Sequence, residues 1–153
     1  MAVCDRYLGL DTQTELHRMN RKFTGRILSF CIAGVWLING LYCKLLNLVP
    51  RHQLIVAKIL GDQNAALATK LIGAAEILMA IWVVSNIKPR ICTAAQIVII
   101  ITMNLLEFFL APELLLFGKA NIIFAFLFCC LILFGNLNAV ALPPRPYRKP
   151  TLP

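Results

Sequence analysis

The residues of this sequence that could do chemistry are carboxylates, lysines and asparagines set within or beside long apolar stretches. Glu76 is the only charged residue between Lys70 and Lys88, and Asn39 and Asn104 also have mainly apolar neighbours. Polar groups are costly to bury in apolar surroundings, so each one is a candidate for a binding or proton-transfer site. What these residues can do depends on the elements that position them.

The composition indicates a membrane protein. Of the 153 residues, 59% are hydrophobic and only 14% are charged. A soluble domain has about 25% charged residues, and a disordered chain is poor in large apolar ones. Both classes are therefore excluded. Since a membrane-spanning helix takes roughly 20 residues, the chain is long enough for about four of them. We predict a small, all-α, polytopic membrane protein.

Charged residues and prolines divide the apolar sequence into four stretches. Pro50, Pro89 and Pro112 fall between these stretches, where the missing proline N–H does no harm to a helix. Lipid cannot satisfy backbone hydrogen bonds, so each stretch is expected to be helical. The short turns around 88–90 and 111–113 should make the last three helices antiparallel neighbours. We predict a four-transmembrane-helix bundle with helices near 26–46, 66–87, 91–110 and 114–139.

The loop between the first two helices, roughly 47–65, contains a further amphipathic segment. From Arg51 to Leu60, helical spacing places Arg51 and Lys58 on a polar face that continues to Asp62, and Val56, Ile59 and Leu60 on an apolar face. This pattern predicts a short amphipathic helix in the headgroup region; the alternative is an ordered loop.

The distribution of Lys and Arg predicts the orientation. Ten of the fifteen lie on the side that holds both termini and the 88–90 turn, which places both termini in the cytoplasm. This basic surface would contact anionic lipid, and without an aromatic platform it does not favour nucleic acid. No cleaved signal peptide is expected. We divide the chain into a cytoplasmic segment (1–25), a membrane domain (26–140) and a proline-rich basic cytoplasmic tail (141–153).

The polar residues of the four predicted helices share a depth in the outer half of the bundle, which predicts an outward-opening polar cavity. Glu76 would be its buried acid, oriented by Asn39 and Asn104, with a Glu107–Lys119 ion pair near the entrance and Lys44 reaching the interface. Alternatively, these side chains form a satisfied network that fixes helix register. The expected cavity residues are Asn39, Glu76, Asn104, Glu107, Lys119 and Asn121, with Lys44, Arg51 and His52 at the mouth.

The cysteines and histidines argue against several kinds of cofactor. No Cys-x-x-Cys pair occurs, and Cys129 and Cys130 lie in an apolar stretch where cysteine acts as a small apolar side chain. His17 and His52 are expected on opposite sides of the membrane, which excludes a haem held by two histidines and a histidine-rich metal site. We therefore expect no metal and no covalently bound cofactor.

Four stretches resemble a known family. They are GVWLINGLYCKLL (34–46), VPRHQLIVAKILG (49–61), GAAEILMAIWV (73–83) and NLLEFFLAPELLLFGKAN (104–121). Together they are similar to the DoxX-like family. The resemblance implies a four-helix bundle in the bacterial cytoplasmic membrane. A better-known branch of the family supplies membrane subunits to a thiosulfate–quinone oxidoreductase, which implies a quinone and a redox or other membrane partner.

Three functions remain open at this point. The first is an accessory membrane subunit whose outer cavity binds a lipid or quinone head group. The second is a small proton-coupled carrier in which Glu76 changes protonation state. The third is a purely structural membrane partner, with the polar cluster holding the helices together. No catalytic motif is present in the sequence, so whether the chain has catalytic activity is left open.

Overall fold

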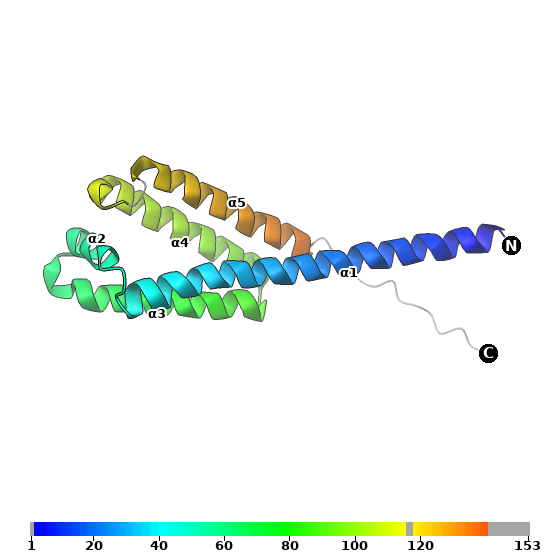
Figure 1. Ribbon diagram of the computed structural model, residues 1–153, viewed down its shortest axis with the longest axis horizontal. Helices are drawn as coiled ribbons and strands as arrows, with labels where there is room; N and C mark the ends of the chain where they lie inside the picture. The colour runs from blue at the N-terminus through cyan, green and yellow to red at the C-terminus, as the bar shows by residue number, and fades with distance from the viewer. Residues whose placement is uncertain (1, 116–117, 141–153) are drawn as a thin grey trace.

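The computed structural model describes the backbone of residues 2–115 and 118–140, and their side chains except at 2–12, 14–15, 17, 119 and 137–140. The secondary structure of this part is entirely helical (Figure 1). The elements in chain order are α1 (Ala2–Leu37), η1 (Ile38–Leu45), α2 (Arg51–Leu60), α3 (Asp62–Ser85), α4 (Pro89–Leu110), η2 (Pro112–Leu114), η3 (Gly118–Ala120) and α5 (Asn121–Val140).

Three helical segments in the described part are long and apolar enough to cross a membrane: Arg18–Leu45, Asp62–Ser85 and Pro89–Leu110. The apolar stretch described in α5, Asn121–Asn136, is shorter. The predicted all-α membrane fold is therefore confirmed. The predicted amphipathic helix is also present, because α2 covers the same residues, Arg51–Leu60.

The first helix begins much earlier than predicted. It starts at Ala2 rather than near residue 26, and continues through η1 to Leu45. Nothing before Pro50 is a proline, and the polar residues of this segment include good helix formers such as Arg, Gln and Glu. The 36 residues of α1 rise about 54 Å at 1.5 Å per residue. Its amino-terminal half therefore projects beyond the other helices (Figure 1).

The last helix begins later than predicted, at Asn121 instead of near residue 114. Pro112 starts one short 3₁₀ turn, and a second begins at Gly118, whose φ of +54° favours glycine. These two turns lengthen the connection between α4 and α5.

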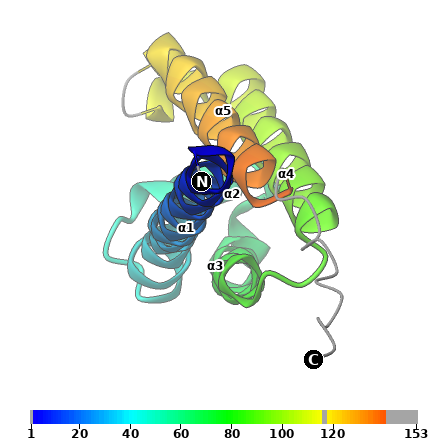
Figure 2. The same cartoon turned by 90° about the vertical axis from the view of Figure 1, so that its right-hand side faces the viewer.

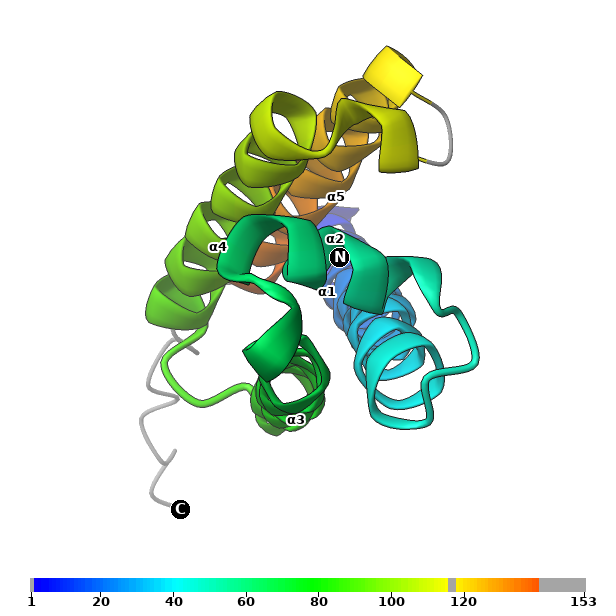
Figure 3. The ribbon, with the colours of Figure 1, turned by 90° about the vertical axis from the view of Figure 1, so that its left-hand side faces the viewer.

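The helices do not pack in the order of the chain. α1 contacts both α3 and α5, and α5 also packs against α4 (Figure 2). The prediction of close neighbours therefore holds for α4 and α5, but α3 makes far fewer contacts with α4 than with α1. α2 crosses one end of the bundle, against α3 and α4 (Figure 3).

A buried cluster joins α1, α3, α4 and α5. Trp36 anchors it: its indole N–H donates a 2.9 Å hydrogen bond to Oε1 of Gln96, which ties α1 to α4. Cys129 is buried here among apolar side chains, as predicted, whereas its neighbour Cys130 is exposed; Cys92 is buried in the same cluster. The buried members are Ile32, Ala33, Trp36, Met79, Ala80, Cys92, Ile100, Cys129 and Ile132.

Two glycines allow η1 and α3 to cross at backbone contact distance. A Cβ added to Gly40 would lie 2.6 Å from the carbonyl oxygen of Gly73, and one added to Gly73 would lie 2.7 Å from the carbonyl oxygen of Gly40. Small residues of this kind let helices approach closely in membranes. η1 is wound as a π-helix, a form that often occurs at functional sites.

Replacing either crossing glycine should destabilise the protein. Gly40→Ala and Gly73→Ala place a methyl group against backbone, so each should lower the free energy of unfolding by about 1–3 kcal/mol. Gly34→Ala is the matched control, because a Cβ there meets nothing within 4 Å. Thermal unfolding in detergent measures the difference. Equal melting temperatures for all three variants would contradict the crossing.

Candidate binding site

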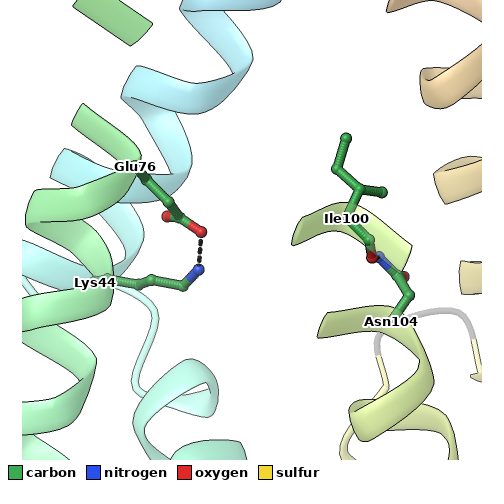
Figure 4. A network of polar contacts seen from close by, with 4 residues as sticks. All are labelled: Lys44, Glu76, Ile100 and Asn104. Carbon is green, nitrogen blue, oxygen red and sulfur yellow. Dashed lines mark hydrogen bonds and ion pairs between the residues drawn. The ribbon is translucent and has the colours of Figure 1, made fainter. Parts of the chain in front are cut away.

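Lys44 and Glu76 form a buried ion pair between η1 and α3. Each residue is only 5% exposed, and the Lys44 ammonium donates a hydrogen bond to Oε1 of Glu76 (Figure 4). The prediction that Lys44 reaches the membrane interface is therefore wrong. The glycine crossing draws the Lys44 backbone against α3, where its ammonium meets the only carboxylate of that helix beyond Asp62.

The pair is held by the packing around it. A Cβ at Gly73 would lie 3.0 Å from Cβ of Lys44, and a Cβ at Gly40 would lie 2.9 Å from Cβ of Glu76. The second carboxylate oxygen of Glu76 is buried and has no hydrogen-bond partner among the described residues. Glu76 is thus buried within the bundle, as the sequence predicts.

A cavity of about 140 Å³ lies where α2 crosses the end of the bundle. Its wall is mostly apolar, and its polar groups come from Lys44, His52 and Glu107. These are three of the nine residues that the sequence predicts for the cavity. The seven other lining residues were not predicted to belong to the cavity. Four of them lie on α2, and the apolar face of that helix was the sequence signal that could have identified them. The lining residues are Lys44, His52, Ile55, Val56, Ile59, Leu60, Ile72, Met103, Leu106 and Glu107.

Charged groups surround the polar end of this cavity. Burial, with the charges of Lys44 and Arg51, lowers the pKa of His52 from 6.5 to about 4. His52 is therefore neutral at pH 7 and can both donate and accept a hydrogen bond. Glu107 lies close enough to interact electrostatically with Lys44, Arg51 and Glu76.

The predicted asparagines lie elsewhere. Asn104 donates a 2.8 Å hydrogen bond to the carbonyl oxygen of Ile100, one turn earlier in α4 (Figure 4). Its side-chain oxygen accepts a 3.3 Å hydrogen bond from the amide of Asn121. Among the side chains that the structure describes, neither Asn39 nor Asn104 bonds to Glu76, so the prediction that they orient it is wrong. The Asn104 side chain instead forms hydrogen bonds within α4 and with α5. The predicted Glu107–Lys119 ion pair lies outside the described side chains, because that of Lys119 is not included.

One contact that the sequence did not predict joins α2 to η2. Lys58 on α2 forms an ion pair with Glu113 in η2. Ile55 and Val56 of α2 are buried beneath it. The sequence signal was the polar face of α2, which carries Lys58.

A second, smaller cavity of about 50 Å³ lies at the opposite end of the bundle. It reaches Gln96, the acceptor of the Trp36 hydrogen bond. The carbonyl oxygen of the Asn136 side chain, also in its wall, is buried without a partner in the described part of the chain. This volume accommodates a few water molecules.

The fold and this site define a helical membrane protein with a mostly apolar cavity beneath a short helix. The model of the DoxX-like family matches residues 33–134, which contain the whole cavity. The chain belongs to the DoxX-like family. No curated protein and no solved structure matches it.

Breaking the buried pair should cost far more than breaking the exposed one. Lys44→Met leaves a buried carboxylate without its partner, so we expect a loss of about 3–5 kcal/mol in unfolding free energy. The double variant Lys44→Met/Glu76→Leu should recover most of this loss, because no lone charge remains. Lys58→Met is the control: its ion pair is 45% and 54% exposed and should contribute at most about 1 kcal/mol. Denaturant or thermal unfolding in detergent distinguishes these values; equal losses in Lys44→Met and the double variant would refute the pair.

His52 should make stability depend on pH. Its pKa of about 4 in the folded protein lies below the ordinary 6.5, so the unfolded chain takes up a proton first as the pH falls. Stability should therefore decrease as the pH falls from about 6.5 towards 4. His52→Gln should remove this part of the decrease. Melting temperatures of both proteins across that range give the difference, and parallel curves would contradict a buried neutral His52.

Proposed function

We propose that this protein spans the bacterial cytoplasmic membrane four times, with both termini in the cytoplasm. The 20 residues of α5 match the roughly 20 needed for a span, which supports the fourth crossing. The excess of Lys and Arg beside the termini and in the 88–90 turn supports the orientation. In this orientation the α2 cavity lies at the outer end of the bundle.

We further propose that the α2 cavity binds the head group of a membrane amphiphile, a lipid or a quinone. The observation that carries this proposal is the cavity itself, which has an apolar wall and a few polar groups, as ligand sites usually do. Its volume of about 140 Å³ resembles that of an apolar cavity that binds benzene, about 150 Å³. The site therefore has room for one ring or a small head group.

The wall of the cavity reaches the lipid-facing surface. Leu60 and Leu106 line the cavity and are also 59% and 42% exposed. A chain attached to the head group could leave between them and enter the bilayer. The family resemblance favours an accessory role in which this protein presents the bound molecule to a redox or other membrane partner.

Filling the cavity tests this function. Ile72→Trp places a large ring in the cavity, whereas Leu71→Trp adds the same ring at a 62% exposed neighbouring position. The first variant should weaken binding of a decyl-substituted benzoquinone or of co-purifying lipid by about tenfold or more, since the space for one ring is lost. The second should bind like the wild type. Native mass spectrometry of the detergent-solubilised protein measures both, and equal binding would leave the structural role as the better account.

The two cavities favour a second candidate function, a small proton-coupled carrier. One cavity lies at each end of the bundle, and Gln96, the acceptor of the Trp36 hydrogen bond, lines the smaller one. In such a carrier Glu76 would change protonation between two states. Glu76→Gln should then abolish pH-driven uptake into vesicles while the protein still folds. If neither the wild type nor Glu76→Gln gives more pH-driven flux than empty vesicles, a carrier is excluded.

A further inference from the structure

A further cation lies beside the polar end of the α2 cavity: Arg51 directly precedes the lining residue His52, and its charge acts on both His52 and Glu107. Lys44 is paired with Glu76, and His52 is neutral at pH 7. Arg51, the first residue of α2, differs from both. Its Nε and Nη1 are shielded from solvent and have no hydrogen-bond partner among the described residues. A buried donor left unpaired is costly, so this arrangement calls for an acceptor.

Glu107 does not meet that need. It lies close enough for its charge to interact with that of Arg51, yet the two form no ion pair within the described part of the chain. Two shielded guanidinium nitrogens call for hydrogen-bond acceptors, and hydrogen bonds between two charged groups are the strongest of this kind. The partner that fits best therefore carries negative charge.

We propose that the amphiphile bound in this cavity has an oxyanion head group, a carboxylate or a phosphate, with Arg51 as its counter-ion. This inference rests on the proposed function and specifies its ligand. Guanidinium groups suit both anions geometrically. A neutral quinone would accept a hydrogen bond from Arg51 but would leave its charge uncompensated.

The geometry of the cavity fits an acyl chain behind such a head group. Arg51 and His52 begin α2, and the apolar residues that line the cavity follow along the same helix at Ile55, Val56 and Ile59. Leu60 then lies at the exposed edge of the wall. An oxyanion beside Arg51 would thus place the first carbons of its chain along α2 and direct the rest towards lipid.

Four amphiphiles with the same twelve-carbon chain test the head-group chemistry: dodecanoate, dodecyl phosphate, dodecanol and dodecylamine. Binding to the full-length protein in neutral detergent is measured by native mass spectrometry or calorimetry at pH 7. We expect dodecanoate or dodecyl phosphate, or both, to bind about tenfold more tightly than dodecanol. A hydrogen bond to a charged group contributes enough free energy for a difference of about this factor. Dodecylamine should bind more weakly than dodecanol. The order of the two anions distinguishes a carboxylate from a phosphate source.

Arg51→Gln identifies the residue responsible. It should reduce the preference for the anions over dodecanol to about twofold or less. Lys70→Gln is the matched control, since it removes one positive charge from an exposed position on α3 and should keep the preference. If Arg51→Gln does not fold, Arg51→Lys retains the charge and should retain the preference. The wild-type order of the four amphiphiles tests the proposal by itself.

The outcomes separate this inference from the function beneath it. If Arg51→Gln keeps the full anion preference, or if dodecylamine binds the wild type as tightly as the anions, the inference is overturned while the cavity can still bind amphiphiles. If all four amphiphiles bind Ile72→Trp as they bind the wild type, binding does not occur in the cavity and the proposed function itself is overturned.

Discussion

The rest of the structure depends on the crossing of η1 and α3 at two glycines. An ion pair inside a membrane protein is favourable only when both charges are close and shielded from lipid. Gly40 and Gly73 meet this condition, because their backbones touch and leave no space between the two helices. Lys44 and Glu76 follow one turn or less from these glycines, so the contact places them within bonding distance. Without it, Lys44 would extend to the interface and Glu76 would stand alone.

The Lys44–Glu76 pair also determines which charged groups near the cavity have no ion-pair partner in the described part of the chain. Because Lys44 is paired with Glu76, the other charged groups are Glu107 in the cavity wall and Arg51 beside it, which come from different helices and form no ion pair in the described part of the chain. α2 supplies His52 and much of the apolar wall, and Arg51 precedes His52 on the same helix. The Lys58–Glu113 ion pair and the burial of Ile55 and Val56 hold this helix over the end of the bundle.

The sequence predicted the parts that depend on local patterns. Periodicity gave the bounds of α2, proline and apolar content placed α4 at about its observed position, and the cost of burying a carboxylate identified Glu76. It could not predict partners. Lys44 was expected at the interface because its neighbours in the chain are at a helix end, whereas its partner is Glu76 on α3, 32 residues later in the chain. The Asn104–Asn121 contact likewise depends on how α4 and α5 pack.

The position of α2 depends on the two connections that join it to the rest of the chain. Its two connections contain residues with positive φ, Asn47 at 51° and Gly61 at 87°, so the direction in which the chain enters and leaves this helix is specified by few residues. A shift of α2 would move Arg51, His52 and the apolar wall together, since all lie on one ten-residue helix. The long helices contribute Lys44 and Glu107 to the cavity wall, and in the function proposed above the sequence of α2 determines which head group is preferred.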